Sequence, residues 1–307
     1  MRVAVIRCDG YEQGRVDESI ARIFELLGGV DKFVKRGQRV LLKPNFIAPK
    51  ESHLAVQTDG AVLIAISKLL LEHGVCPVIG DSPAWGDVRA CAAALGIDEK
   101  LKQLGVGLKQ LDRPKWVYLP EARMRVGIST AALEADAIIN VPKLKSHQQL
   151  VATIAVKNMF GCVSGKWKPF WHYARGSSEE RFCEMLVGIY KYLKPAITIV
   201  DGVVAMEGAG PIHGKPRALG MLVASEDAMG CEAVCAKAIG LDECELPIVR
   251  AWFAEQKPKI DFELVGDELA VCEDFERAKP IPIRFSLGRV CKSAAKQLLL
   301  RAGLRGK

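Results

Sequence analysis

Short apolar runs alternate with longer amphipathic segments along the 307-residue chain. The short runs predict strands at residues 2–6, 39–43, 75–80, 137–141, 196–200, 219–224 and 262–265. The longer segments have helical periodicity and predict helices at 17–27, 60–73, 88–95, 148–160, 179–192 and 227–239. This alternation predicts an α/β fold, in which mostly parallel sheets are flanked by helices.

The same pattern is compatible with either one continuous domain or two α/β lobes with the site between them. In the two-lobe division, residues 1–145 form an N-terminal lobe and residues 146–283 form a second lobe. Residues 106–135 predict a β-hairpin that leaves the main alternation, rather than a linker between domains.

The net charge of +7 is concentrated at the end of the chain, because residues 284–307 hold seven Lys or Arg and no acid. Apolar residues recur there at helical spacing and predict a basic amphipathic helix. This helix either packs on the body or docks on an acidic protein or an anionic membrane surface. No nucleic-acid-binding motif accompanies the charge, so we expect no nucleic-acid partner.

The ten cysteines are scattered along the chain, and no CxxC pair occurs. Their spacing fits neither a zinc nor a ferredoxin site, so we expect no cluster held by the chain's own cysteines. Isolated cysteines are typical of reduced, buried thiols. Because the sequence also lacks a signal-peptide pattern and an apolar run of about 20 residues, we expect a cytoplasmic protein without a transmembrane segment.

Polar side chains follow four predicted strands, in the segments LLKPNF, IGDSP, INVPKLKSH and ITIVDG. Because the ligand crevice of an open parallel sheet lies at the carboxyl ends of its strands, we expect these side chains along one rim. They are Lys43, Asn45, Asp81, Ser82, Lys143, Lys145, His147 and Asp201. Each alone is also an ordinary turn residue, and only their common position indicates a binding site.

The segment EGAGPIHGK, residues 207–215, follows a strand and is rich in glycine. It lacks the glycine spacing and the Ser or Thr of a phosphate-binding P-loop. Glu207, Gly208 and Gly210 belong either to a loop whose backbone N–H groups approach an anion or to a plain glycine turn.

The segment VPKLKSHQQLVATIAVKNMFG, residues 141–161, places charged residues within an apolar stretch. A Ser-x-x-Gln capping box predicts that a helix begins at His147. On that helix His147, Lys157 and Asn158 share one face, and His147 and Lys157 lie about 15 Å apart. Lys157 either pairs with an acid in the core or faces a ligand cavity, in which His147 would act as general acid or base.

The next segment, CVSGKWKPFWHYARG, is dense in aromatic and basic residues. It predicts a lid over the ligand, with glycine hinges, Trp171 excluding water, and Lys166 and His172 holding an anion. The alternative is an ordinary surface loop whose aromatic rings pack on the body.

Ordered segments between residues 39 and 240, among them LLKPNF, IGDSPAWG and IVDGVVAMEGAGPIHGKP, resemble the family named domain of unknown function 362. Many members of that family carry a ferredoxin module in the same chain. This sequence has no cysteine run for such a module. The resemblance therefore implies that any electrons come from a separate ferredoxin-type protein.

That family is in turn similar to nickel-pincer lactate racemases. In these enzymes a His is followed ten residues later by the Lys that carries the pincer cofactor, and a further His binds nickel. His147, Lys157 and His172 have closely similar spacing. The resemblance implies a nickel-pincer-like cofactor on Lys157 as one option, with His172 as the metal ligand.

Together these features predict an enzyme that binds a small or medium anionic substrate or cofactor. Its reaction would be either redox chemistry with an external iron–sulfur donor or isomerisation at a carbon next to a carboxylate. The expected anion contacts are Lys43, Asn45, Lys143 and Lys145, and the supporting carboxylates are Asp81, Asp201 and Glu207. The alternative is a non-catalytic carrier of a cofactor or cluster precursor, which docks through its basic tail.

Overall fold

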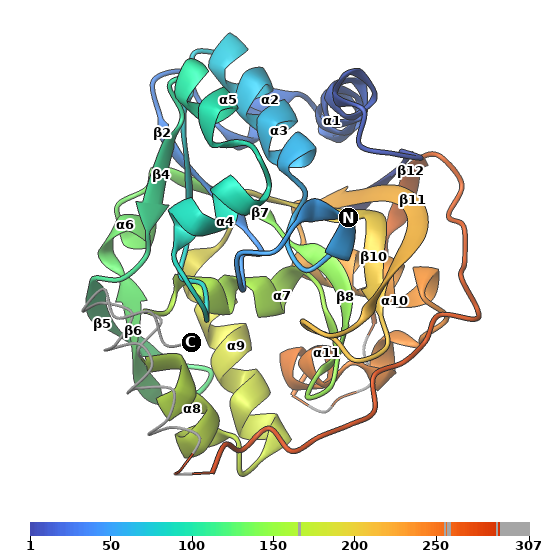
Figure 1. Ribbon diagram of the computed structural model, residues 1–307. Coiled ribbons are helices and arrows are strands. Elements are labelled where there is room, and N and C mark those ends of the chain that lie inside the picture. The colour runs from blue at the N-terminus through green and yellow to red at the C-terminus, as the bar shows by residue number, and fades with distance from the viewer. Residues whose placement is uncertain (165–166, 255, 257–258, 287, 289–307) are drawn as a thin grey trace.

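One large sheet runs through the protein (Figure 1). The computed structural model describes residues 1–164, 167–254, 256, 259–286 and 288. Within them, eight strands follow the order β12-β1-β11-β10-β7-β2-β3-β4, and β8 and β9 join this sheet beside β10. Their bounds are β1 Arg2–Arg7, β2 Arg39–Pro44, β3 Cys76–Asp81, β4 Gly107–Gln110, β7 Ala137–Val141, β8 Lys143–His147, β9 Val151–Thr153, β10 Ile197–Glu207, β11 Lys215–Ser225 and β12 Glu263–Gly266.

Most neighbouring strands of the sheet are parallel. Strand β2 pairs in parallel with β3 and β7, β3 with β4, and β7 with β10. Strand β11 pairs antiparallel with both β10 and β1. The mostly parallel α/β fold expected from the sequence is therefore confirmed. Strands from both sides of residue 145 share this sheet, and the division into two lobes stays a prediction.

Helices cover both faces of the sheet (Figure 1). One face carries α1 (Gln13–Leu27), α3 (Gly60–Glu72) and α4 (Val88–Ala94). The other carries α7 (Ala155–Asn158), α9 (Glu179–Leu193), α10 (Ala228–Ala238) and α11 (Pro247–Trp252). Strand β1 supplies both cores by alternation, because Ala4 and Ile6 face the first set of helices while Val3 and Val5 face the second. The shorter helices are α2 Val30–Phe33, α5 Asp98–Gln103, α6 Thr130–Leu133, α8 Lys168–Arg175, η1 Ser52–Leu54, η2 Met159–Cys162 and η4 Glu243–Glu245.

The strand order reverses between β2 and β7. From β2 the chain crosses through α3 to β3 and through α4 and α5 to β4, moving steadily away from β7. It then returns to β7 on the other side of β2, and the helix α9 before β10 packs on the opposite face. Such a reversal opens a crevice at the carboxyl ends of the two strands, where α/β proteins bind their ligands.

The predicted helix at residues 148–160 is wrong. The chain instead extends as β8, turns back as β9, and then forms the short helix α7, followed by the 3-10 helix η2. Strand β8 is held by β10 on one side and β9 on the other. The Ser146 hydroxyl, expected to cap a helix, donates to the Gly208 carbonyl at 2.8 Å. Tertiary pairing thus overrides a local pattern that favours a helix.

The β-hairpin expected within residues 106–135 is confirmed, since β5 (Pro114–Leu119) and β6 (Met124–Ser129) pair antiparallel.

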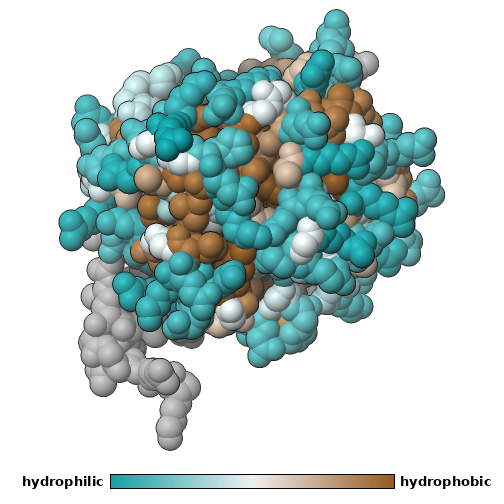
Figure 2. Space-filling view, turned by 90° about the horizontal axis from the view of Figure 1, so that it is seen from above, coloured by the Kyte–Doolittle hydropathy of each residue, from teal (hydrophilic) through white to brown (hydrophobic). Residues whose placement is uncertain are grey.

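On the face seen in Figure 2, hydrophilic side chains surround a central group of hydrophobic ones. No helix among the described residues is long and apolar enough to cross a membrane. Residues 287 and 289–307, which hold most of the predicted C-terminal helix, lie outside the described residues.

Candidate functional site

A cavity of about 480 Å³ lies at the carboxyl ends of β2 and β3, beside the reversal of strand order. It is lined by seven predicted site residues: Lys43, Asn45, Asp81, His147, Lys157, Asn158 and His172. Its other walls include Phe46, Trp85, Phe160, Lys168, His213 and Phe285. A hollow of this size that combines aromatic and charged groups is typical of a small-molecule site.

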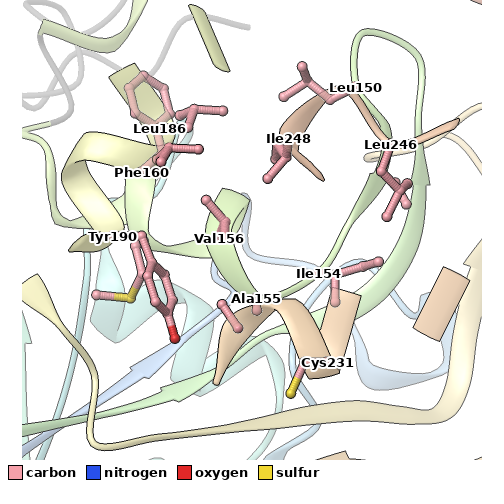
Figure 3. Close-up of a cluster of buried hydrophobic side chains, with 14 of the residues drawn as sticks. Leu150, Ile154, Ala155, Val156, Phe160, Leu186, Tyr190, Cys231, Leu246 and Ile248 are labelled. Atoms are coloured by element: carbon pink, nitrogen blue, oxygen red, sulfur yellow. The ribbon is translucent and has the colours of Figure 1, made fainter. Parts of the chain in front are cut away.

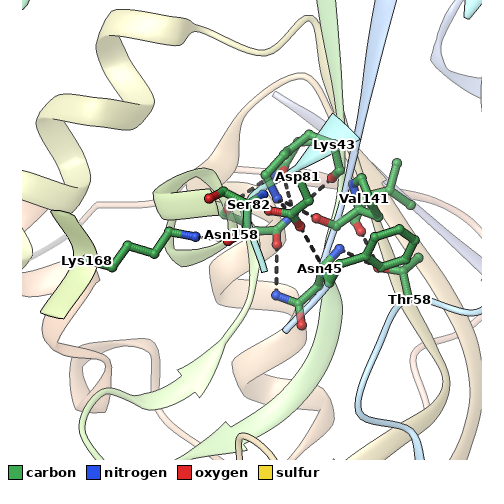
Figure 4. Close-up of polar contacts among 12 residues, drawn as sticks. Lys43, Asn45, Thr58, Asp81, Ser82, Val141, Asn158 and Lys168 are labelled. Atoms are coloured by element: carbon green, nitrogen blue, oxygen red, sulfur yellow. Dashed lines mark hydrogen bonds and ion pairs between the residues drawn. The ribbon is translucent and has the colours of Figure 1, made fainter. Parts of the chain in front are cut away.

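Lys43 and Asp81 form a buried ion pair at the floor of the cavity (Figure 4). The Lys43 Nζ lies 2.7 Å from Asp81 Oδ2, and both side chains are almost fully buried. The same carboxylate accepts from the backbone N–H groups of Phe46 at 2.9 Å and Ser82 at 2.6 Å. Gly161 packs against this pair so closely that a Cβ there would overlap the atoms of Lys43 and Asp81. Gly161 is therefore a point of close packing.

A chain of amide side chains extends from this pair (Figure 4). Asn158 Nδ2 donates to Asn140 Oδ1 at 2.8 Å and to the Lys43 carbonyl at 3.0 Å. Asn158 Oδ1 accepts from Asn45 Nδ2 at 2.9 Å. This leaves Asn45 Oδ1 buried without a hydrogen-bond partner among the described residues, at the cavity wall. A buried orphan acceptor of this kind suits a donor on a ligand.

Lys157 reaches the cavity from α7, which is anchored from behind by buried apolar side chains (Figure 3). The first turn of α7 has no cap from its own neighbour Ile154. Instead, Glu232 of α10 accepts from the Val156 N–H at 2.9 Å. Burial raises the pKa of Glu232 to about 7, although hydrogen bonds from Val156 and Ala155 act in the opposite direction. A distant helix thus fixes the position of Lys157.

The Lys157 amine has no hydrogen bond or ion pair within the described part of the chain. Its Nζ lies 4.9 Å from the centre of the Phe160 ring. Burial lowers the pKa of Lys157 to about 7, and the charges of Lys168 and Lys43 act in the same direction. An amine with this pKa is partly unprotonated at neutral pH and can act as a base or a nucleophile.

His147 lies at the end of β8 and is buried. Its Nδ1 accepts a hydrogen bond from the Gln149 backbone N–H at 3.1 Å, which places the ring proton on Nε2. Burial lowers the pKa of His147 well below its usual value, and the charges of Lys157 and Lys145 add to this effect. The ring is therefore neutral at physiological pH and serves as a hydrogen-bond donor.

The segment predicted as a lid loop forms helix α8 instead. Lys168 lines the cavity and donates to the Ser82 carbonyl, and burial lowers the pKa of Lys168 to about 8. The His172 ring stacks on Phe285 with 4.3 Å between centroids. Trp171 does not line the cavity but packs on Trp116, with 6.4 Å between their centroids. Gly165 and Lys166 lie outside the described residues.

Two predicted anion contacts, Lys143 and Lys145, turn inward instead of lining the cavity. Lys143 Nζ lies 2.9 Å from Asp201 Oδ2 and 2.6 Å from the Tyr11 hydroxyl. Lys145 Nζ donates to the carbonyls of Val56 at 2.8 Å and Pro211 at 3.3 Å. These bonds link the strand ends to neighbouring segments. The two amines that the sequence assigned to a ligand are therefore already bonded within the protein.

The glycine-rich segment at residues 207–215 forms a turn against β8. Glu207 accepts from the Glu276 N–H at 3.0 Å and points away from the cavity lining. Gly208 has a φ of +72°, which favours glycine, and a Cβ on Gly210 would overlap the Ser146 carbonyl. The residues between and after them, Ala209, Pro211, Ile212 and His213, line the cavity instead.

Several residues that line the cavity were not selected from the sequence. Trp85 follows the carboxyl end of β3 closely enough that the strand-end rule would have found it. His213 lies within the glycine-rich segment, but nothing in its local pattern indicates a ligand. Phe285 reaches the cavity from the far end of the chain, and no local signal predicts that. No group of three or more His, Cys, Asp or Glu among the described residues is placed to hold a metal ion.

Fold and site together define a mixed α/β protein with a cation-rich cavity at the carboxyl ends of its parallel strands. The family described as Domain of unknown function (DUF362) matches residues 40–237, and the chain belongs to this family. The resemblance predicted from the sequence is confirmed.

One relative is the "Thylakoid-associated protein sll1697" of Synechocystis sp. (strain ATCC 27184 / PCC 6803 / Kazusa). It is 36% identical over 304 residues, which cover 97% of this chain and 95% of the relative. Among solved structures, the chain is similar to the lactate racemase apoprotein from Thermoanaerobacterium thermosaccharolyticum, with a TM-score of 0.49 and 13% identity. That similarity covers 76% of this chain and 56% of the racemase chain.

Proposed function

We propose that the protein is an enzyme that binds a small or medium anionic ligand in this cavity and moves a proton on it. The observation that carries the proposal is the amine of Lys157, which has no hydrogen bond or ion pair among the described residues and lies in a cation-rich cavity. Among the described residues the lining holds Lys43, Lys157 and Lys168, and of these only Lys43 is balanced by a carboxylate, Asp81. The remaining positive charge favours a ligand with a carboxylate or phosphate group.

The proposed roles follow from the protonation states. Lys157 acts as the base, because a pKa of about 7 leaves a large unprotonated fraction at neutral pH. His147 donates its Nε2 proton toward an oxygen of the ligand. Lys168 contributes a positive charge that favours the anionic group, and Asn45 Oδ1 accepts from a ligand hydroxyl. Among the reaction classes expected from the sequence, this arrangement favours isomerisation at a carbon next to a carboxylate.

Two further ideas from the sequence stay predictions. The first is redox chemistry with a separate ferredoxin-type protein. The second is a nickel-pincer-like cofactor on Lys157, with His172 at the metal; Lys157, His147 and His172 all line the cavity. The intact mass of natively purified protein checks the second idea, because a covalent cofactor adds mass to the peptide that contains Lys157.

Binding is tested by calorimetry with lactate, and with lactamide as its uncharged analogue. We expect lactate to bind, lactamide to bind at least tenfold more weakly, and Lys168→Met to lose most of the difference. Lys191→Met is the matched control, because Lys191 lies outside the cavity, over the Trp252 ring. Equal binding of lactate and lactamide would contradict the anion site.

Catalysis is tested by following the loss of the lactate α-proton signal in deuterated water by NMR. We expect exchange with the wild-type protein, and none with Lys157→Met. His147→Ala separates the enzyme from the carrier alternative: as an enzyme, the variant keeps most of its lactate affinity but loses exchange. The carrier alternative would be favoured by two results together. His147→Ala would lower only the affinity for lactate, and the wild-type protein would exchange the α-proton of no small hydroxy acid.

A further inference from the structure

We propose that Lys157 forms a covalent imine with a 2-oxo carboxylate bound in the cavity. This inference rests on the proposed function for recognition of the carboxylate, and adds a substrate class and a covalent step. The Lys157 nitrogen attacks the ketone carbon, a C–N bond forms, and the carbonyl oxygen leaves as water. Atoms and electrons balance without an oxidant or reductant, since amine and ketone give imine and water.

The three lysines of the cavity differ in what their amines already bond. Lys43 Nζ donates to Asp81 at 2.7 Å and to the Pro44 carbonyl at 2.5 Å. Lys168 Nζ donates to the Ser82 carbonyl. The Lys157 Nζ has no such acceptor within the described part of the chain. A nucleophilic amine needs a free lone pair, and among these three lysines Lys157 is the one with no acceptor holding its protons.

The surroundings of Lys157 favour a neutral amine over an ammonium ion. Helix α7, which carries Lys157, packs on a buried apolar cluster (Figure 3). Lys168 and Lys43 add positive charge on the cavity side. A desolvated lysine beside other cations is the arrangement that activates amines for imine formation.

The remaining groups fit the other end of the ligand. His147 has its Nδ1 occupied by the Gln149 N–H, so its Nε2 proton is available to the carbonyl oxygen and to the water that leaves. A carboxylate next to the ketone meets the positive charge of Lys168, which is fixed by Ser82. An imine next to a carboxylate acidifies neighbouring C–H bonds, and because the Lys157 nitrogen is then part of the imine, it no longer acts as the base for them.

The experiment traps the imine on the full chain by adding pyruvate and sodium cyanoborohydride, which reduces the C=N bond. We expect one reduced pyruvate adduct, located by peptide mapping on Lys157, and at least tenfold less labelling with acetone, which lacks the carboxylate. Lys191→Met should label like the wild type. Adducts spread over exposed lysines, or labelling that persists in Lys157→Met, would overturn the proposal.

A second variant at Lys157 tests whether a loss of labelling comes from misfolding rather than from the missing amine. Lys157→Arg keeps a positive charge but forms no imine under these conditions, so it should bind lactate and remain unlabelled by pyruvate. If the wild type binds lactate but pyruvate is never trapped, the imine is overturned while the proposed anion site stands. If neither lactate nor pyruvate is bound, both proposals fall. A mass adduct already present on Lys157 after native purification would also overturn the imine.

Discussion

Three lysine side chains line the cavity, and their bonding partners differ. Lys43 is neutralised by Asp81, and Lys168 donates to the Ser82 carbonyl. Lys157 has no acceptor among the described residues, and its burial is therefore costly whenever the amine is charged. A partly buried amine that has an aromatic ring beside it but no acceptor for its protons is typical of residues retained for chemistry.

Lys157→Met is expected to stabilise the folded protein. The pKa of Lys157 is about 7 in the folded protein and 10.5 ordinarily. Between these values the unfolded chain binds more protons, so the stability of the wild type rises with pH. The advantage of the Met variant in free energy of unfolding is thus largest below pH 7, about 2–4 kcal/mol, and shrinks toward about pH 10. Urea unfolding at several pH values measures it, and a pH-independent difference would contradict the unpaired amine.

Gly161→Ala is expected to damage the floor of the cavity. The added Cβ would overlap Lys43 and Asp81, so the ion pair has to separate or shift. Separating a buried pair typically costs about 3–5 kcal/mol. Thermal unfolding and lactate calorimetry should both report the loss. Gly14→Ala is the matched control, because a Cβ on Gly14 meets no atom within 4 Å. If Gly161→Ala unfolds like the wild type, the close packing is not as described.

At the scale of elements, helix α7 is too short to hold itself in place. It spans Ala155–Asn158, and its first turn takes its cap from Glu232 on α10. Short helices gain most of their stability from tertiary contacts rather than from helix propensity. The position of Lys157 therefore depends on the packing of α10 beneath it.

Glu232→Gln is expected to flatten part of the pH dependence of stability. The pKa of Glu232 is about 7 in the folded protein and 4.5 ordinarily. Between these values the folded protein binds the proton more tightly, so the stability of the wild type falls as the pH rises from about 4.5 to 7. Gln keeps an acceptor for the Val156 N–H but has no proton to lose. The Gln variant should gain on the wild type by up to about 3 kcal/mol above pH 7.

Unfolding followed across that pH range gives this difference directly. Glu232→Ala is the contrasting variant, because it removes the acceptor and leaves the Val156 N–H buried without its partner. It should be less stable than the Gln variant at every pH, because both lack the titrating carboxyl group and only Gln keeps the acceptor. A Gln variant that parallels the wild type throughout would show that Glu232 does not titrate in this range.

The sequence pattern was misleading at this same scale. Helical spacing predicted that His147 and Lys157 share a face of one helix, but they lie on β8 and α7, separated by the return strand β9. The pairing of β8 with β10 decides this, through contacts such as that between Lys143 and Asp201. Such long-range pairing is invisible in a local window of sequence. Both side chains nevertheless line one cavity.

At the scale of the whole molecule, the rule for carboxyl ends of strands predicted the location of the cavity. Among the residues that it selected, Lys43, Asn45 and Asp81 line the cavity. It could not separate these from Lys143, which is equally placed at a strand end. The partners that turn Lys143 inward are Tyr11 and Asp201, which are 132 and 58 residues away in the sequence. Only the folded arrangement shows which cations are already neutralised.

Ligand binding is expected to protect distant segments together from hydrogen exchange. The cavity wall is contributed by β2, α7, α8, residues 209–213 and residues 281–285. A ligand that contacts all of them stabilises each against local opening. Exchange measured by mass spectrometry with and without saturating lactate should slow in these segments and remain unchanged in α5, which lies outside the lining. Protection confined to one segment would place the ligand elsewhere.

The wall that Ile281 and Phe285 contribute also sets an order of events during synthesis. A growing chain presents its β2 and β3 to the solvent long before these two residues leave the ribosome. The cavity is complete only when at least 285 residues have been translated. A nascent chain that ends before these residues lacks part of the cavity wall, so the complete binding site forms only after the rest of the sheet has been translated.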